Sequence, residues 1–413
     1  MRRQASILFV NRVFPPDRGA TGRLLCDLAG RFALAGWRVT VVADGAASAD
    51  GGLADGGPAG VRVVRSGGGG EEAPGAAGYL GALARLTATA LAQPAHDVAV
   101  TMTDPPMLAC LGPLLRLRHG SRLIHWCQDL YPELFPVLGV GLPRPVLTGI
   151  AALSTAALGR HDRIVAIGAC MRRRLAARGL PAARLEVLPN WGQPGLRPQE
   201  PDPAIREVLA GGARFLALYA GNLGRAHPVA ALAEAAAELA VTDPDVRILV
   251  AGDGRRRAAL AGIAAGGTLR LLPYQDEAAL ARLYAAADLH LALLDPRAEG
   301  LMLPCKVAAG LAAGCPVVLH GPPGSDAARM IGDAGAVAPA GEPGALAAAI
   351  RSFARAPGRM AQARAAARHR AEDPAERWDA DRAAARFLAL AGSLRPGPTV
   401  PAGAAVPAGP APP

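Results

Sequence analysis

Aromatic side chains are scarce in this chain of 413 residues, at 4% of the total. Its apolar residues are instead dominated by Ala, Val and Leu, which favours helices packed on buried parallel strands over an aromatic-rich sandwich. Cysteine is also rare, and no two cysteines form a CxxC pair or have a His partner at metal-ligand spacing. We therefore expect reduced, mostly buried thiols rather than a disulfide scaffold at Cys26, Cys110, Cys127, Cys170, Cys305 and Cys315.

Long hydrophobic runs are missing as well. No stretch reaches the roughly 18 uninterrupted apolar residues of a membrane span. The apolar run at residues 7–10 is too short for the core of a secretory signal and is typical of a first strand. We therefore expect a cytoplasmic protein.

The net charge of +10 comes almost entirely from arginine. Such a balance suits anionic partners, namely nucleotide diphosphates, nucleic acid or an anionic membrane surface. Nucleic-acid-binding proteins usually carry a run of basic residues interleaved with aromatic residues, and this chain has no such run. We expect no nucleic-acid partner, and we interpret the arginines at 172–174 as a solvated helix face.

Short β-branched runs alternate with Ala- and Leu-rich helical patterns in the first half of the chain. This alternation predicts a doubly wound parallel sheet. The expected strands are 7–13, 38–43, 61–64, 97–102, 122–126, 163–167 and 184–188, and the expected helices are 20–35, 78–92, 105–118, 143–159 and 169–178.

The alternation stops at a proline-rich stretch and then begins again. After it we expect strands at 215–220, 246–251, 269–272, 289–294 and 316–319, with helices at 228–240, 255–265, 277–286 and 304–313. The chain is thus predicted to form a Rossmann-like domain (1–190), a linker (191–213), a second Rossmann-like domain (214–374), a helix that crosses back to the first domain (375–392) and a disordered tail (393–413).

Two loops of the first domain follow strands, at the sheet edge where open α/β proteins bind ligands. The first is "FPPDRGATGR", where Gly19 would let the backbone of a helix N-terminus approach a phosphate, although an ordinary turn would look the same. The second is "HWCQDLYPE", where Gln128 and Asp129 could contact a sugar hydroxyl or an acceptor. Asp129 could instead cap the following turn, and His125 is expected to be a packed core residue.

Two loops of the second domain carry matching features. In "LYAGNLGRAHP", Asn222 and Arg225 lie between a buried strand and a helix N-terminus, where a guanidinium and the helix dipole could share a diphosphate. In "DPRAEGLMLPCKVAAGLAAGCPVV", Lys306 lies in the first turn of a helix. A cation opposes the dipole there, so its position indicates a bound anion.

These stretches, with "VLPNW", "AGDGRRRAAL" and "LPYQDEAALARLYAAADLHLALL", resemble the family-4 glycosyltransferases. The likeness is to the WbuB-like, colanic-acid-type branch that builds bacterial surface polysaccharides. It implies the GT-B fold, two Rossmann-like domains with a nucleotide-diphosphate sugar in the cleft between them. Gly19 would face the diphosphate, Arg225 and Lys306 would neutralise it with amides near Leu301 and Met302, Glu299 would hold donor-sugar hydroxyls, and Asn222 and Tyr274 would complete the donor site.

The chain departs from the family pattern at two positions. Gln128 stands where many members place a His that serves the donor sugar. Many members also carry a second Glu on the ribose, and that position falls on Ala309. The residue that binds the ribose is therefore unassigned.

The resemblance implies retaining transfer from a nucleotide sugar, expected to be a UDP-sugar, without a protein nucleophile. Because no DxD-type carboxylate pair stands out near the predicted phosphate loops, we predict no metal and no cofactor. The acceptor would be lipid-linked or a polysaccharide. The alternatives are a nucleotide-sugar 2-epimerase, which would need clustered acid and base side chains, and a non-catalytic partner subunit.

A peripheral position at the inner face of the cell membrane is also expected. The segments 78–92 and 145–159 are apolar helical patterns with few charges, and arginines lie close to them in sequence. Burial against the sheet is the simpler role for both. An exposed flank, however, would bind anionic lipid through apolar contact and arginine attraction.

Overall fold

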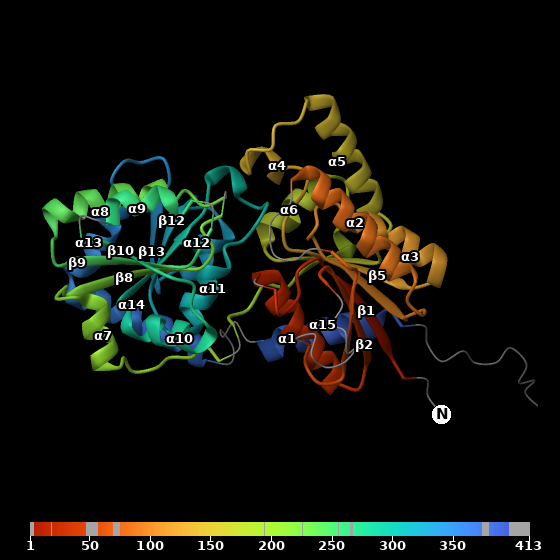
Figure 1. Ribbon diagram of the computed structural model, residues 1–413, viewed down its shortest axis with the longest axis horizontal. Helices are drawn as coiled ribbons and strands as arrows, with labels where there is room; N and C mark the ends of the chain where they lie inside the picture. Colours follow the sequence, from red (N-terminus) through yellow and green to blue (C-terminus); the bar gives the residue numbers. More distant parts are fainter. Residues whose placement is uncertain are drawn as a thin grey trace, which may run out of the picture.

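The computed structural model describes residues 4–17, 19–46, 57–68, 75–193, 195–224, 226–254, 256–264, 267–373 and 380–395. These residues form two α/β domains that lie side by side, each with a parallel sheet between layers of helices (Figure 1). The doubly wound architecture predicted from the sequence is therefore confirmed.

The first sheet has the strand order β3-β2-β1-β4-β5-β6-β7, and every neighbouring pair is parallel. The order reverses between β1 and β4, which is where such sheets open a crevice at their carboxyl edge. The strands are β1 (Ser6–Val10), β2 (Arg38–Ala43), β3 (Val61–Arg65), β4 (Val98–Thr101), β5 (Arg122–Cys127), β6 (Arg163–Ala166) and β7 (Leu185–Val187).

The second sheet has the order β10-β9-β8-β11-β12-β13, again parallel, and reverses between β8 and β11. Its strands are almost continuous runs of Val, Leu, Ile and Ala, as expected for strands covered on both faces. They are β8 (Phe215–Ala220), β9 (Val246–Ala251), β10 (Leu269–Leu272), β11 (Leu289–Leu293), β12 (Val317–Gly321) and β13 (Gly335–Pro339).

Helices cover both faces of each sheet (Figure 1). Those of the first domain are α1 (Ala20–Leu34), α2 (Ala76–Leu91), α3 (Leu111–His119), α4 (Leu134–Val137), α5 (Arg144–Leu158) and α6 (Ala169–Ala177). Those of the second are α8 (Ala230–Thr242), α9 (Ala258–Ala264), α10 (Glu277–Ala286), α11 (Cys305–Ala312), α12 (Asp326–Ile331), α13 (Ala345–Ala354) and α14 (Pro357–Glu372).

The stretch predicted as a linker contains a helix, α7 (Pro203–Ala210), which the sequence analysis did not predict. An Asp202 carboxylate oxygen accepts hydrogen bonds from the backbone nitrogens of Ala204 and Ile205, at 2.9 and 3.2 Å. Pro203 then takes the first helical position, which its fixed φ favours. The prolines that suggested a linker therefore include a helix-start signal.

The last helix, α15 (Ala380–Ser393), packs on the first domain against α1 (Figure 1). The ring of Phe387 lies edge-on to Phe32 and Trp126, with ring centroids 6.1 and 5.3 Å apart. This contact joins the end of the chain to its beginning. The predicted disordered tail lies, from residue 396 on, outside the described residues.

Two smaller expectations can be compared with the structure. No disulfide links the cysteines that the structure describes; Cys127, Cys170 and Cys315 are buried and the others are half-buried. His125 is a buried core residue, as expected, with Nδ1 3.0 Å from Oγ1 of Thr101.

Candidate functional site

A cavity of about 570 Å³ lies between the two domains, at the carboxyl edges of both sheets. The end of β5, the start of α1 and the stretch after β7 line it from the first domain. The turns after β8 and β9, the segment after β10 and the start of α11 line it from the second. Of the predicted site residues, it brings together Gly19, Gln128, Asp129, Asn222, Tyr274, Met302 and Lys306.

Lys306 is the only lysine of the chain and lines this cavity while being only 5% exposed. Its Nζ lies 3.5 Å from the carbonyl oxygen of Asn222 and 4.9 Å from the centre of the Tyr219 ring. Gly221, at φ +125°, passes so close that a Cβ there would lie 3.1 Å from Cε of Lys306. Among the described residues no carboxylate pairs with this ammonium group, so it is suited to an anion entering the cavity.

The N-terminus of α1 faces the same cavity. Gly19, Ala20 and Thr21 line it, and the structure shows no side chain of the described residues capping the helix. Uncapped backbone amides and the helix dipole favour a negative charge at this point. Next to them, Nη1 of Arg23 donates a hydrogen bond to the hydroxyl of Tyr274, at 3.2 Å, across the two domains.

The end of β5 contributes Gln128 and Asp129. The Gln128 and Asn190 amides bond each other reciprocally, at 3.1 and 2.6 Å, which fixes both side chains in the cavity wall. The Asp129 carboxylate makes no hydrogen bond within the described part of the chain. Burial, followed by the nearby charge of Asp104, raises the pKa of Asp129 to about 7. Its predicted capping role is not observed.

Histidine 227 lines the cavity and was not singled out from the sequence, although it lies in the "GRAHP" stretch. Nδ1 of His227 is 3.0 Å from the carbonyl oxygen of Leu293, which can only accept, so Nδ1 carries the proton and Nε2 is an acceptor. Burial, followed by the charge of Lys306, lowers the pKa of His227 to about 3. Asn190 and Asp253 also line the cavity and were not predicted from the sequence. Asp253 could have been found, because it is a polar residue that follows the buried strand β9 by two positions.

Glu299 is not among the residues that line the cavity, and its predicted contact with donor-sugar hydroxyls stays a prediction. A turn of 3-10 helix (Pro296–Ala298) and the left-handed Gly300, at φ +70°, flank it. Its Oε1 instead lies 3.7 Å from Sγ of Cys170 in α6. Arg225, another of the predicted site residues, lies outside the described residues.

The backbone amides of Leu301 and Met302, predicted to contact the diphosphate, both make hydrogen bonds within their own turn. Both backbone nitrogens donate to the carbonyl oxygen of Ala298, at 2.9 and 3.3 Å. The carbonyl oxygen of Leu301 accepts from the backbone nitrogen of Leu130, at 2.7 Å, and the buried Leu301 side chain belongs to the apolar contact between domains. Met302 alone of the two lines the cavity.

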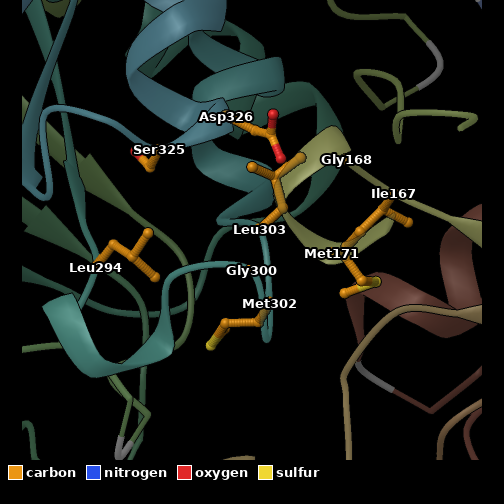
Figure 2. A pocket seen from close by; sticks show the side chains of 9 residues that line it. All are labelled: Ile167, Gly168, Met171, Leu294, Gly300, Met302, Leu303, Ser325 and Asp326. Carbon is orange, nitrogen blue, oxygen red and sulfur yellow. The ribbon is translucent and has the colours of Figure 1, made fainter. Parts of the chain in front are cut away.

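A second, much smaller hollow of about 10 Å³ lies nearby on the same interface (Figure 2). Ile167, Gly168 and Met171 of the first domain line one side, and Leu303 and Asp326 are among the residues on the other. Its size leaves room for about one water. Among the described residues, no group of three His, Cys, Asp or Glu side chains is placed to hold a metal ion.

Comparisons with known proteins agree with this geometry. The "Glycosyl transferase 4-like domain" family matches residues 19–191 and "Glycosyl transferases group 1" matches residues 214–355, about three quarters of the chain together. Over 232 residues the chain is 28% identical to the putative colanic acid biosynthesis glycosyl transferase WcaI of Escherichia coli (strain K12). That match covers 51% of this chain and 54% of WcaI, so it spans about half the length of this curated relative.

Solved structures show the same fold. Sucrose-phosphate synthase of Thermosynechococcus elongatus superimposes with a TM-score of 0.75 at 16% identity, covering 95% of this chain and 99% of that one. HepE of Anabaena, solved with UDP and glucose, gives 0.66 at 17% identity, covering 94% and 100%. The two family matches follow the two domains in order, and the chain belongs to the family-4 glycosyltransferases of the GT-B fold.

Proposed function

We propose that this protein is a retaining glycosyltransferase that moves a sugar from a UDP-sugar to a lipid-linked or polysaccharide acceptor in bacterial surface glycan synthesis. The observation that carries the proposal is the lone lysine, Lys306, which is buried in the cavity between the domains and has no carboxylate partner in the part of the chain that the structure describes. The uncapped N-terminus of α1 faces the same space. Two positive elements from two domains suit a diphosphate bound between them.

The proposed reaction depends on negative charge that develops on the donor diphosphate next to Lys306 and the α1 amides. When the bond between the anomeric carbon and the diphosphate breaks, negative charge grows on the departing phosphate oxygen. Lys306 and the α1 amides, which line the cavity, would stabilise this charge and so favour the transition state over the bound donor. The same departing oxygen takes the proton of the acceptor hydroxyl, which attacks from the same face and retains the configuration.

Asp129 is proposed to orient the acceptor rather than to attack the sugar. It lies at the end of β5 in the cavity wall, where an ionised carboxylate accepts a hydrogen bond from an incoming hydroxyl. Gln128, fixed by Asn190, is a neutral hydrogen-bonding group next to it. We also propose that the reaction needs no divalent metal, because Lys306 and the α1 terminus supply positive charge at the proposed diphosphate site.

A peripheral position at the cytoplasmic membrane face is part of the proposal. Helix α5 buries only Ser154, Ala157 and Leu158, so the expectation that it is largely buried is wrong. It exposes Val146 and Leu153, at 46% and 58%. Helices α2 and α3 lie on the same side of the first domain and expose Leu80, Leu114 and Leu117 (Figure 1). Among the described residues, no helix combines the length and the apolar character that crossing a bilayer requires.

The test is direct detection of donor and product. The purified chain is mixed with a set of nucleotide sugars and analysed by native mass spectrometry, and the bound donor is then incubated with polyprenyl-diphosphate-linked sugars. Transfer with the donor's anomeric configuration, read by NMR, is expected. An inverted product, or tight donor binding without transfer to any acceptor, would contradict the proposal.

A further inference from the structure

His227 offers one unpaired hydrogen-bond acceptor at the cavity between the domains. The residue comes after the turn that follows β8, is 9% exposed and lines the cavity. Its Nδ1 donates to the carbonyl oxygen of Leu293, the last residue of β11, at 3.0 Å. Its Nε2 makes no hydrogen bond to a described residue, yet it is not a fully buried atom. The lone pair of Nε2 is therefore available to a group that enters the cavity.

The imidazole of His227 is neutral, so it acts as an acceptor rather than as a second cation beside Lys306. Burial, followed by the positive charges of Lys306 and Arg256, lowers the pKa of His227 to about 3. Nη1 of Arg256 lies 3.4 Å from the carbonyl oxygen of His227, and Lys306 lines the same cavity. Phosphate oxygens are acceptors too, and they do not pair with a lone pair. The partner that suits Nε2 is therefore a hydrogen-bond donor of the ligand.

Other polar side chains line the cavity, but they do not make the same demand on a ligand. An amide donates as well as accepts, so it tolerates either kind of partner. The Asp253 carboxylate already accepts from the backbone nitrogen of Gly254, at 2.8 Å. Among the described residues of the second domain, His227 thus adds a fixed, neutral group that accepts only. The amides of the cavity lining are Gln128, Asn190, Gln193, Asn222 and Gln275.

His227 and Asp129 border the same stretch of cavity wall from the two domains. The Nδ1 bond to Leu293 joins His227 to the beginning of the segment that follows β11. Near the end of that segment, the carbonyl oxygen of Leu301 accepts from the backbone nitrogen of Leu130, the neighbour of Asp129. A group that lies against this stretch therefore has His227 on the side of one domain and Asp129 on the side of the other.

Resting on the proposed function, we infer that His227 determines donor specificity, because its Nε2 accepts a hydrogen bond from a hydroxyl of the transferred sugar. That sugar is bonded to the diphosphate proposed at Lys306 and is attacked by the hydroxyl proposed at Asp129. It is thus the part of the donor that lies between these two groups and faces the stretch of wall beside His227. A sugar with no hydroxyl opposite Nε2 leaves the acceptor unpaired and binds more weakly.

Two substitutions separate the two nitrogens of His227. His227→Asn keeps an amide N–H at about the place of Nδ1, so the bond to Leu293 is retained while the Nε2 acceptor is lost. His227→Gln is the matched control, because its longer side chain brings an amide oxygen to about the place of Nε2.

Calorimetry on the full chain compares UDP with UDP-glucose, UDP-galactose and UDP-N-acetylglucosamine. His227→Asn should weaken the UDP-sugar that the native chain binds tightest by about three- to ten-fold, the effect of one hydrogen bond, and should change UDP binding by less than about two-fold. His227→Gln should recover most of the lost affinity.

Analogues of the same UDP-sugar in which fluorine replaces one sugar hydroxyl provide a second measurement, because fluorine cannot donate a hydrogen bond. At one sugar position the replacement should weaken binding to the native chain by about three- to ten-fold. The same replacement should have little effect in His227→Asn, where the partner is already absent. Each comparison is made within one chain, so a general loss of affinity in the variant cancels.

The outcomes separate this inference from the proposed function. If every fluorinated analogue binds the native chain as its parent does, or if the fluorine effect persists in His227→Asn, the inference is wrong while the nucleotide-sugar function stands. Uptake of a proton when UDP binds the native chain but not His227→Asn would also overturn it, because His227 would then be a cation on the diphosphate. If neither UDP nor any of the UDP-sugars binds, the proposed function is wrong and the inference falls with it.

Discussion

The carboxylate of Asp326 lies against the N-terminus of α6, with Oδ2 2.6 Å from the backbone nitrogen of Cys170. Asp326 belongs to the second domain and Cys170 to the first, so a residue of one domain caps a helix of the other (Figure 2). Gly168 makes this approach possible, since a Cβ there would lie 2.3 Å from the same oxygen. The contact joins the two domains beside the cavity.

Replacing Asp326 with Ala should loosen the domain contact. Loss of a cap is expected to lower the free energy of unfolding by about 0.5–2 kcal/mol and to increase the radius of gyration measured by small-angle X-ray scattering. Asp333→Ala is the matched control, because Asp333 is exposed and its pair with Arg370 stays within the second domain. If both variants keep the native radius of gyration and stability, Asp326 does not hold the domains together.

The lone lysine allows a chemical test of the diphosphate site. Reductive methylation modifies amines, and this chain offers only its N-terminus and Lys306. A nucleoside diphosphate should protect Lys306, but not the N-terminus, from methylation, as read by peptide mass spectrometry. Lys306→Ala should weaken nucleoside diphosphate binding by about 1.5–3 kcal/mol, the scale of a charge-assisted hydrogen bond. Unchanged methylation and affinity would remove Lys306 from the site.

The pKa of Asp129 predicts that kcat/KM depends on pH. Its raised pKa of about 7 means that the carboxylate is protonated below that pH and charged above it. Because the charged form accepts the acceptor hydroxyl's hydrogen bond, kcat/KM should rise as pH increases through about 7. Asp129→Asn should remove this rise and lower kcat/KM by about ten-fold or more. A native profile that is flat between pH 6 and 8 would contradict the proposed role.

The raised pKa of Asp129 also predicts that the free energy of unfolding falls as pH rises, whereas kcat/KM is expected to rise. The folded state holds the Asp129 proton more tightly than the unfolded chain, so its contribution to stability is full below about pH 4 and is lost as pH rises to about 7. Asp129→Asn should therefore stabilise the protein at pH 8, by about 1–3 kcal/mol, and have little effect at pH 4. Denaturant titration at the two pH values measures this difference.

The proposed metal independence rests on the same charges. Turnover in excess EDTA should stay within about two-fold of turnover in Mg²⁺, because Lys306 and the α1 terminus stabilise the departing diphosphate. Lys306→Ala provides the internal control, since its activity should drop under both conditions. A loss in EDTA that Mg²⁺ or Mn²⁺ restores would reject this mechanism.

Local sequence signals predicted the strands up to β12, although not β13, because such strands depend on short-range patterns. They also singled out Lys306, which lines the cavity, and its binding of an anion stays a prediction. Buried parallel strands appear as continuous apolar runs, and Lys306 was found because a cation in a first helical turn is unfavourable without an anion. The direction of Glu299 was not predictable in this way. It is set by the left-handed Gly300 next to it and by the position of α6 in another domain.

The other features that were not predicted depend on contacts between residues far apart in the sequence. Asn190 is fixed by Gln128, which lies 62 residues earlier, and no local pattern marks that partnership. The exposed face of α5 was likewise not predictable, because an apolar helix pattern does not reveal whether another element covers it. In this fold α5 packs mainly on a short 3-10 helix (Leu108–Cys110), and much of its outer surface stays exposed.

That exposed surface predicts binding to anionic membranes. Val146 and Leu153 of α5 provide apolar contact, and the exposed Arg144 lies at the start of the same helix. The chain should co-sediment with vesicles that contain anionic lipid and should bind neutral vesicles less. Binding to anionic vesicles should also fall as salt rises, since salt screens the attraction between arginine and lipid.

Leu153→Glu should weaken binding by about 2 kcal/mol, because the variant loses one leucine side chain buried in the membrane and adds a charge of the same sign as the lipid. Val241→Glu in α8, also at an exposed apolar residue but in the second domain, should bind as the native chain does. A chain that stays in the supernatant with anionic vesicles at low salt would make a soluble acceptor the better proposal.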